Sequence, residues 1–203
     1  MTSNKYGALW LSYSSITDYL KCPRLYYLRN IWKNRNGKKV NVVGPHMSLG
    51  SAIHQTIEPL SKIRTEDRLA VDLLLKFEEN FIKYSGIRGG FVDLETEKQF
   101  KEKGVEMIKN LISNPGPITK KTISFENTTS SMPPNFLLHK NPDIILCGYV
   151  DWIEYLEDGN NLRVIDFKTG DKEEKEDSLQ LPIYKLLVEN IKPKWKVAKA
   201  AYW

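Results

Sequence analysis

Residues 148–170 read GYVDWIEYLEDGNNLRVIDFKTG, and this stretch decides the expected fold. Asp158-Gly159 between two apolar runs is the strongest short signal for a β-hairpin. If these two residues occupy the centre of the turn, Asp151 faces Asp166, because each lies seven residues from the turn. Their Cβ atoms are then about 5 Å apart. This pairing requires a loop with an even number of residues.

The predicted hairpin gathers charged side chains on one face. Lys168 lies two residues beyond Asp166 and points to the same side of the strand. Two adjacent carboxylates repel each other, and a hard divalent cation with oxygen ligands relieves that repulsion. Asp151 and Asp166 are therefore candidate ligands of Mg²⁺. Lys168 is a candidate for orienting water, for stabilising charge on a phosphate or for acting as a general base, although two adjacent carboxylates favour its protonated form. The alternative is a surface cluster of weak salt bridges, but the apolar neighbours of Asp166 make an unpaired charge costly there.

Size and composition indicate one globular domain. The chain has 203 residues, of which 41% are hydrophobic and 27% charged. No apolar run is long enough to cross a membrane, and the N-terminus lacks the pattern of a signal peptide. We therefore expect a soluble cytoplasmic protein with no membrane partner. Cys22 and Cys147 are too few for a four-cysteine metal site, and a disulfide scaffold is not expected in a chain of this size.

Hydrophobic periodicity predicts helices first and strands later. The predicted elements are helices at 16–32 (broken near Pro23), at 47–59, within 65–84 and at 93–113, a strand at 122–126, a loop at 130–142, hairpin strands at 143–157 and 162–168, a helix at 179–189 and a strand at 197–203. This order indicates the α/β (α+β) class with a central sheet. We expect a single domain over 1–203, with a helical portion around 45–115 and a catalytic core around 120–203.

The positive charge is concentrated near the N-terminus. Residues 1–50 carry eight Lys or Arg and one Asp, whereas the whole chain has a net charge of only +5. Aromatic residues are interleaved with these cations, as at Arg24 and Tyr27. Basic groups neutralise phosphates, and aromatic rings stack on bases. By itself the segment favours a solvated surface helix; beside a candidate phosphate chemistry, it is a candidate nucleic-acid surface.

Two pairs of residues show helical i, i+4 spacing. Gly50 and His54 share one helical face, where a small residue lets another group approach and a histidine can bind a metal. A structural role is the commoner one for a lone helical histidine. Gln180 and Tyr184 have the same spacing on a helix whose N-terminus can receive a phosphate. For this second pair, function and simple amphipathicity are equally good interpretations.

Together these motifs resemble the RecB-type branch of the PD-(D/E)XK nuclease superfamily, to which AddB-type and CRISPR-adaptation nucleases are related. The resembling segments, in chain order, are 12–28 around Lys21-Cys22-Pro23-Arg24, 50–54 (GSAIH), 148–151 (GYVD), 164–170 (VIDFKTG) and 180–184 (QLPIY). Each motif is weak alone, but the ordered set spreads over most of the chain.

The resemblance implies a restriction-endonuclease-like mixed sheet flanked by helices and a metal-dependent DNA nuclease. By similarity, the ligands of Mg²⁺ or Mn²⁺ are His54, Asp151, Asp166 and the carbonyl of Phe167. Lys168 joins the two aspartates in catalysis, and Gln180 and Tyr184 position the DNA strand or the active site. The expected reaction is exonucleolytic hydrolysis of single strands or free ends in repair, recombination or defence. No helicase motif is present, so a helicase or recombination partner would be a separate protein.

The sequence departs from the resembled pattern at two places. Some relatives hold an iron–sulfur cluster through one cysteine near the N-terminal helix and three near the C-terminus. Cys22 matches the first, but no cysteine follows Cys147, so no iron–sulfur cluster is expected from this chain alone. Pro182 removes a hydrogen bond from the helix that carries Gln180 and Tyr184, unless that helix starts late.

Two other functions remain open at this point. One is a non-catalytic nucleic-acid-binding module of the same fold, against which the intact Asp-x-Lys motif and His54 argue. The other is a metal-dependent enzyme with a non-nucleic substrate, which the basic N-terminal segment disfavours.

Overall fold

The computed structural model of the protein describes residues 7–40, 42–123, 132–156, 161–170, 174–175 and 177–203. The chain divides into two compact units. The first unit comprises Met1–Val42, Phe125–Val150 and Asp177–Val197, and the second comprises Val43–Ser124, Asp151–Glu176 and Ala198–Trp203. Each unit contains both helices and strands, so the predicted α+β class is confirmed. The single-domain description stays a prediction.

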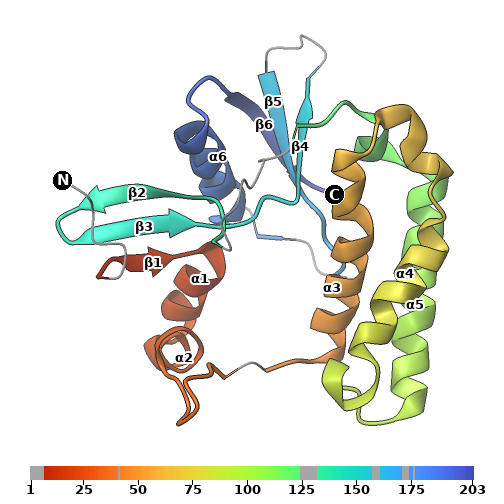
Figure 1. Ribbon diagram of the computed structural model, residues 1–203, viewed down its shortest axis with the longest axis horizontal. Coiled ribbons are helices and arrows are strands. Elements are labelled where there is room, and N and C mark those ends of the chain that lie inside the picture. Colours follow the sequence, from red (N-terminus) through yellow and green to blue (C-terminus); the bar gives the residue numbers. More distant parts are fainter. Residues whose placement is uncertain (1–6, 41, 124–131, 157–160, 171–173, 176) are drawn as a thin grey trace. The chain divides into compact units, whose positions relative to one another are not determined.

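The first unit is built on a mixed three-stranded sheet. Its elements are β1 (Leu9–Leu11), α1 (Tyr13–Lys21), α2 (Pro23–Tyr26), the π-helix η1 (Tyr27–Ile31), β2 (Asn135–Lys140), β3 (Asp143–Cys147) and α6 (Gln180–Ile191). The strand order is β1-β3-β2, with β1 parallel and β2 antiparallel to β3 (Figure 1). The predicted loop at 130–142 is thus wrong over β2, because pairing with β3 overrides the turn-forming composition of that segment.

The N-terminal helix breaks where proline predicts it. Ser12 caps α1 by accepting a hydrogen bond from the Ser15 N–H, and the Ser15 hydroxyl lies 2.8 Å from the Ser12 nitrogen in return. Cys22 then adopts an extended conformation between α1 and α2. A residue before proline avoids the helical region, and Pro23 fits the first position of a new helix.

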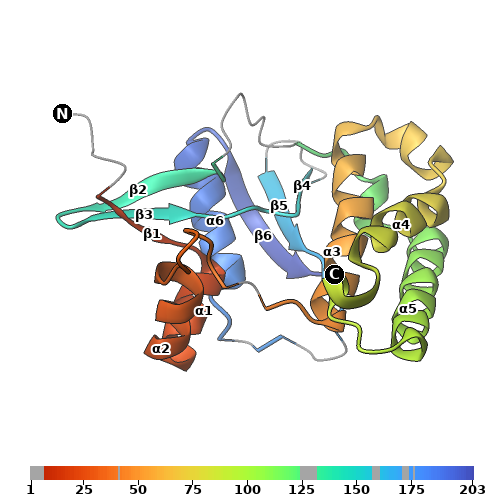
Figure 2. The ribbon, with the colours of Figure 1, turned by 60° about the horizontal axis from the view of Figure 1, so that its bottom comes forward.

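The second unit combines a helical layer with a β-sheet. Its elements are α3 (Pro45–Ile57), η2 (Glu58–Lys62), η3 (Thr65–Ala70), α4 (Leu73–Phe81), η4 (Ile82–Tyr84), η5 (Gly86–Gly89), α5 (Leu94–Ser113), η6 (Gly116–Thr119), β4 (Trp152–Tyr155), β5 (Asn161–Asp166) and the end of β6 (Lys196–Tyr202). The strand order is β4-β5-β6. Figures 1 and 2 show α3, α4 and α5 side by side. No helix in the described part of the chain is long and apolar enough to cross a membrane.

Helices and hairpin of the second unit share one hydrophobic core. Its buried members are Leu49, Ala52, Ile53, Ile57, Leu60, Leu73, Phe77, Phe81, Phe91, Ile108, Leu111, Ile118, Trp152, Ile165 and Phe167. Gly104 lets α5 approach α4 closely, since a Cβ there would lie 2.1 Å from the Phe77 ring. Trp152, Ile165 and Phe167 anchor the hairpin in this core. The segments that carry Asp151 and Asp166 are therefore fixed against α3.

A buried arginine adds hydrogen bonds beside the same core. Arg68 is 2% exposed, and its guanidinium donates hydrogen bonds to the carbonyls of Ile63, Ile118 and Lys120. The guanidinium carbon also lies 5.1 Å from the centre of the Trp152 ring. These contacts satisfy carbonyl groups left open by the short 3₁₀ turns. They secure the helical layer to the start of β4.

The β4–β5 hairpin has the predicted register. Trp152 pairs with Ile165 and Tyr155 with Leu162, so position 151 stands opposite position 166 when the ladder is continued. The turn at Asp158-Gly159 lies outside the described residues. The single long strand predicted at 143–157 is wrong, because residues 143–147 form β3 of the other sheet. A largely apolar run does not by itself reveal whether it forms one strand or two.

Candidate active site

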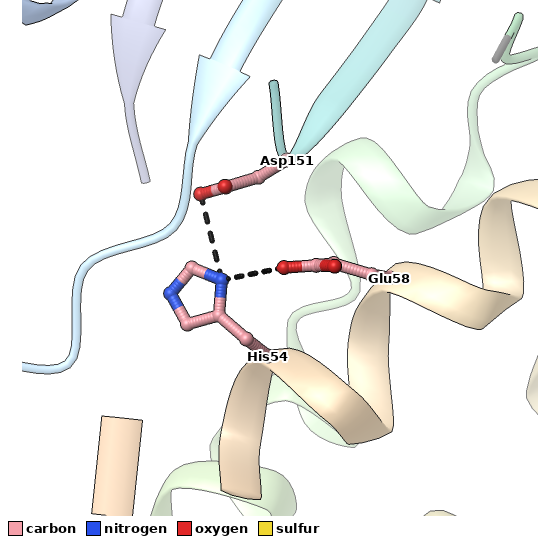
Figure 3. A group of neighbouring side chains, drawn as sticks. All are labelled: His54, Glu58 and Asp151. Atoms are coloured by element: carbon pink, nitrogen blue, oxygen red, sulfur yellow. Dashed lines mark hydrogen bonds and ion pairs between the residues drawn. The ribbon is translucent and has the colours of Figure 1, made fainter. Parts of the chain in front are cut away.

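Three charged or polar side chains of the second unit converge from α3, η2 and the start of the hairpin. Figure 3 shows His54, Glu58 and Asp151 pointing toward one another, and one ligand atom from each lies within 4.8 Å of the others. The Nδ1 atom of His54 is 2.9 Å from Glu58 Oε1 and 3.6 Å from Asp151 Oδ2. His54 and Glu58 are one helical turn apart, which places them on the same face. We call these three residues the candidate metal group.

The main chain of Phe167 completes the surroundings of this group. Its N–H donates a hydrogen bond of 2.9 Å to Asp151 Oδ2, and its carbonyl oxygen lies 3.1 Å from His54 Nε2. Asp166, the preceding residue, is buried, and its charge acts on both Asp151 and His54. The structure thus brings His54 and Asp151 together with Glu58 and the main chain of Phe167, whereas the predicted ligand Asp166 is not one of the three residues whose ligand atoms converge within 4.8 Å.

Burial strongly perturbs the acidity of Asp151. Loss of water around its carboxyl raises the pKa of Asp151 to about 7, and the charges of Asp166 and Glu58 act in the same direction. The neighbouring His54 and the Phe167 N–H oppose this rise. A carboxyl group that titrates near neutral pH exchanges its proton readily for a cation.

The surroundings of His54 favour its protonated, positively charged form. Burial alone would lower its pKa, but the hydrogen bond to Glu58 and the charges of Asp151, Glu58 and Asp166 outweigh this effect and raise the pKa. Both ring nitrogens face acceptor oxygens, so only the doubly protonated ring donates to both. The positive charge of the imidazolium then neutralises nearby carboxylates, a role that a bound divalent cation could also fill.

The donor set fits a divalent metal ion. Carboxylate and carbonyl oxygens suit Mg²⁺ and Mn²⁺, while an imidazole nitrogen favours transition metals. The combination of His54 with Glu58 and Asp151 therefore fits a divalent cation that accepts both donor types.

Lys168 is held beside the candidate metal group by two carboxylates. Its Nζ atom lies 2.9 Å from Asp166 Oδ2 and 3.0 Å from Glu174 Oε1, and 5.0 Å from the centre of the Tyr202 ring. Burial would lower the pKa of Lys168, but its hydrogen bonds to Asp166 and Glu174 and their charges outweigh burial and raise it. A charged ammonium is suited to stabilising negative charge rather than to accepting a proton.

Sequence reasoning missed two residues of this site. Glu58 follows His54 at the same i, i+4 spacing that links Gly50 to His54, so a signal for it was available. Glu174 belongs to a charged segment in which nothing distinguishes it, and only the structure shows its contact with Lys168. Gly50 brings α3 close to Thr169, because a Cβ at Gly50 would lie 3.1 Å from the Thr169 hydroxyl.

The predicted DNA-contacting residues all belong to the first unit. Gln180 and Tyr184 are buried, and the Gln180 side-chain amide donates a 3.1 Å hydrogen bond to the Tyr184 hydroxyl. Pro182 costs no hydrogen bond, because the Ile183 N–H is the donor to Leu179 at the start of α6. Arg24 and Tyr27 are exposed, the latter by 50%.

Two comparisons with known proteins each cover most of the chain. Residues 10–203 match the PD-(D/E)XK nuclease superfamily, and this range contains all five of the motif segments. The chain is 23% identical over 184 residues to the B subunit of the ATP-dependent helicase/deoxyribonuclease of Clostridium acetobutylicum. That alignment covers 82% of this chain and 16% of the bacterial protein.

Proposed function

Because the chain belongs to the PD-(D/E)XK nuclease superfamily, we propose that it hydrolyses DNA phosphodiester bonds with Mg²⁺ or Mn²⁺. Nucleases of this superfamily use divalent metal ions. The observation that carries the proposal for this chain is the convergence of His54, Glu58 and Asp151 within 4.8 Å. The ammonium of Lys168, held by Asp166, supports the same reaction.

The proposed ligands are His54, Asp151, Asp166 and the Phe167 carbonyl, with Glu58 added by its position in the structure. When bound, the cation polarises a phosphate oxygen and makes a bound water more acidic. The Phe167 N–H keeps Asp151 oriented by its hydrogen bond. Burial of Asp151 and Asp166 excludes water, which strengthens every charge interaction in the site.

Lys168 acts as the positive group of the reaction. Asp166 holds its ammonium by a 2.9 Å contact, so the amine is positioned and stays protonated. It donates a hydrogen bond to the phosphate oxygen on which negative charge grows. Glu174 makes a second contact with the ammonium and restricts the positions that it can take.

The DNA strand is bound by exposed groups of the first unit. Tyr27 offers an aromatic face for stacking and Arg24 a cation for phosphate. The buried Gln180–Tyr184 pair fixes the first turn of α6. Because the bacterial relative is part of a helicase/deoxyribonuclease, we infer exonucleolytic action on single strands or free ends, with a helicase or recombination protein as partner.

End-labelled DNA tests the proposal directly. Single- and double-stranded substrates are incubated with Mg²⁺, Mn²⁺ or EDTA and resolved by length over time. We expect cleavage that needs the cation and is lost in Asp166→Asn and Lys168→Ala. Asp67→Asn, an exposed aspartate of η3, serves as the matched control and keeps full activity. Progressive shortening from an end identifies an exonuclease, whereas internal fragments identify an endonuclease.

Binding without cleavage would contradict the proposal. If the protein binds DNA in the presence of Mn²⁺ but releases no product, the non-catalytic nucleic-acid-binding module is the better description.

A further inference from the structure

The second unit contains a pocket of about 300 Å³ between α3, α5 and the segment that follows β5. Its walls are largely apolar and include Ile53 and Ile57 of α3, Leu111 of α5 and the ring of Phe167. Small-molecule sites typically measure about 300–1,000 Å³ and combine apolar walls with a few polar groups. The size therefore suits one small, flat ligand.

This pocket shares its walls with the candidate active site. On α3, Ile53 and Ile57 line the pocket, while the residues that follow each of them, His54 and Glu58, belong to the candidate metal group. Phe167 contributes its ring to the pocket and its carbonyl to the surroundings of His54. Lys168, whose ammonium contacts the phosphate in the proposed function, also lines the pocket. A phosphate held by Lys168 therefore brings its nucleoside near the pocket, because only a sugar separates a phosphate from its base.

An aromatic wall is fixed to the same backbone. The Trp203 N–H donates to the Asp166 carbonyl at 3.0 Å, and the Trp203 carbonyl accepts from the Lys168 N–H at 2.8 Å. This pattern is that of a parallel ladder, and it sets Trp203 opposite Phe167, with ring centroids 5.6 Å apart. The Trp203 side chain lines the pocket, yet 41% of the residue remains exposed. Its indole therefore forms an aromatic side of the pocket, edge-on to Phe167.

Polar groups stand at the edge of the pocket. Asn110 and Asn114, both exposed, lie at the end of α5 and line the pocket. A side-chain amide carries both donors and an acceptor, which match the edge of a nucleobase. An aromatic face with amides beside it is a common way to bind an unstacked base.

We propose that this pocket receives one nucleobase of the DNA strand, adjacent to the phosphate that is cleaved. This inference rests on the proposed nuclease function and deepens it, because it names a subsite that selects the substrate. A base can enter only when it is unpaired and unstacked. The pocket thus gives the enzyme a preference for single strands and frayed ends.

Oligonucleotides with one missing base test this subsite. A series of end-labelled single strands carries a tetrahydrofuran abasic nucleotide at successive positions, and each is digested with Mn²⁺. We expect one bond, at a fixed distance from the abasic position, to be cut about tenfold more slowly, as befits the loss of one stacked base. All other bonds are cut at the rate of the intact strand.

Two variants locate the effect in the pocket. Trp203→Ala removes the discrimination, so that the abasic and intact strands are cut equally fast at that bond. Asn110→Trp changes an exposed position at the pocket edge, which spares the fold, and we expect it to raise KM about tenfold. Ser113→Trp on the same helix is the matched control, because Ser113 is exposed and lies outside the pocket lining.

The possible outcomes distinguish failure of the nucleobase pocket from failure of the nuclease function. Cleavage by the wild type at equal rates along every abasic strand overturns the nucleobase pocket and leaves the nuclease function intact. The pocket is overturned in the same way if Asn110→Trp behaves like Ser113→Trp. Absence of any cation-dependent cleavage overturns the nuclease function, and the pocket inference with it.

Discussion

The two aspartates of the candidate active site and the aromatic and basic residues of the N-terminal helices are exposed to very different degrees. The side chains of Asp151 and Asp166 are 9% and 4% exposed and are held by Phe167 and Lys168. On the N-terminal helices, Tyr27 is 50% exposed and Arg24 is exposed as well. Chemistry on a phosphate needs fixed, desolvated groups, whereas binding a flexible polyanion needs accessible ones. Mutations should therefore lower kcat in the first region and affinity in the second.

The largest expected effect is that of Asp151→Asn. The amide keeps the size of the side chain but removes the negative charge that a cation requires. We expect kcat to fall by at least about 10³-fold, while the Kd for single-stranded DNA stays within about threefold. Steady-state cleavage and fluorescence anisotropy measure the two quantities. If this variant loses affinity for DNA but keeps its kcat, the proposed division between a catalytic region and a DNA-binding region is wrong.

Lys168→Ala should have the next largest effect. Loss of the ammonium removes a preorganised positive charge from the phosphate, and we expect kcat to fall by about 10²–10³-fold with little change in KM. Lys168→Arg keeps the charge and should retain part of the rate. Lys76→Ala, which removes an exposed lysine paired with Glu79, is the control. Equal losses in the Lys76 and Lys168 variants would show that the contact with Asp166 has no special role.

Glu58→Gln sharpens the definition of the metal site. Glutamine can still accept the hydrogen bond from His54 but brings no charge, so we expect Mn²⁺ to bind about 10–100-fold more weakly. High Mn²⁺ should restore cleavage. Calorimetric titration with Mn²⁺ measures this without relying on activity, and Glu79→Gln controls for loss of a similarly exposed carboxylate. An unchanged Mn²⁺ affinity would remove Glu58 from the ligand set.

The sequence predicted best where a local rule determines geometry. The hairpin register followed from one turn and strand alternation, and it placed Asp151 opposite Asp166. The break at Pro23 followed from proline chemistry. Both features are decided by residues that are close in the chain.

The sequence did not predict the strands whose pairing partners lie far along the chain. β1 has three residues, too few for a periodic signal, and it forms only because β3 supplies its hydrogen bonds from far along the chain. The boundary between β3 and β4 was invisible for the same reason, since the two strands pair in different sheets. The contact between Glu174 and Lys168 is one that no periodicity in the sequence indicates.

The exposed region should respond through affinity. For Arg24→Ala and Tyr27→Ala we expect the Kd for single-stranded DNA to rise about five- to tenfold, with kcat unchanged at saturating DNA. Arg24→Ala should also reduce the slope of log K against log salt by about 0.7, the value for one phosphate contact on a single strand. Tyr27→Ala should leave that slope as it is. Arg64→Ala, an exposed arginine of the second unit, is the control; an equal loss there would mean that general charge, rather than this surface, binds DNA.

The smallest expected effect is a change of stability with pH, and it distinguishes the two regions without any DNA substrate. Burial raises the pKa of Asp151 to about 7, so between about pH 4 and pH 7 the folded carboxyl holds a proton that the unfolded chain has released. Stability therefore falls as the pH rises through this window. The raised pKa of His54, in which contacts with Glu58 and Asp151 outweigh burial, extends the fall, because its stabilising proton is lost as the pH passes the folded pKa.

Thermal unfolding in EDTA should thus show a Tm that decreases by a few degrees between pH 5.5 and pH 8. Mn²⁺ added at pH 8 should recover the loss, since a bound cation replaces the protons among the same carboxylates. Asp151→Asn should flatten the curve, because an amide does not titrate, whereas Arg24→Ala should preserve its slope. A Tm that rises with pH over this range would show that the carboxylates around His54 need neither a proton nor a metal ion. Burial of Asp151 would then not distinguish the candidate active site from the exposed N-terminal helices.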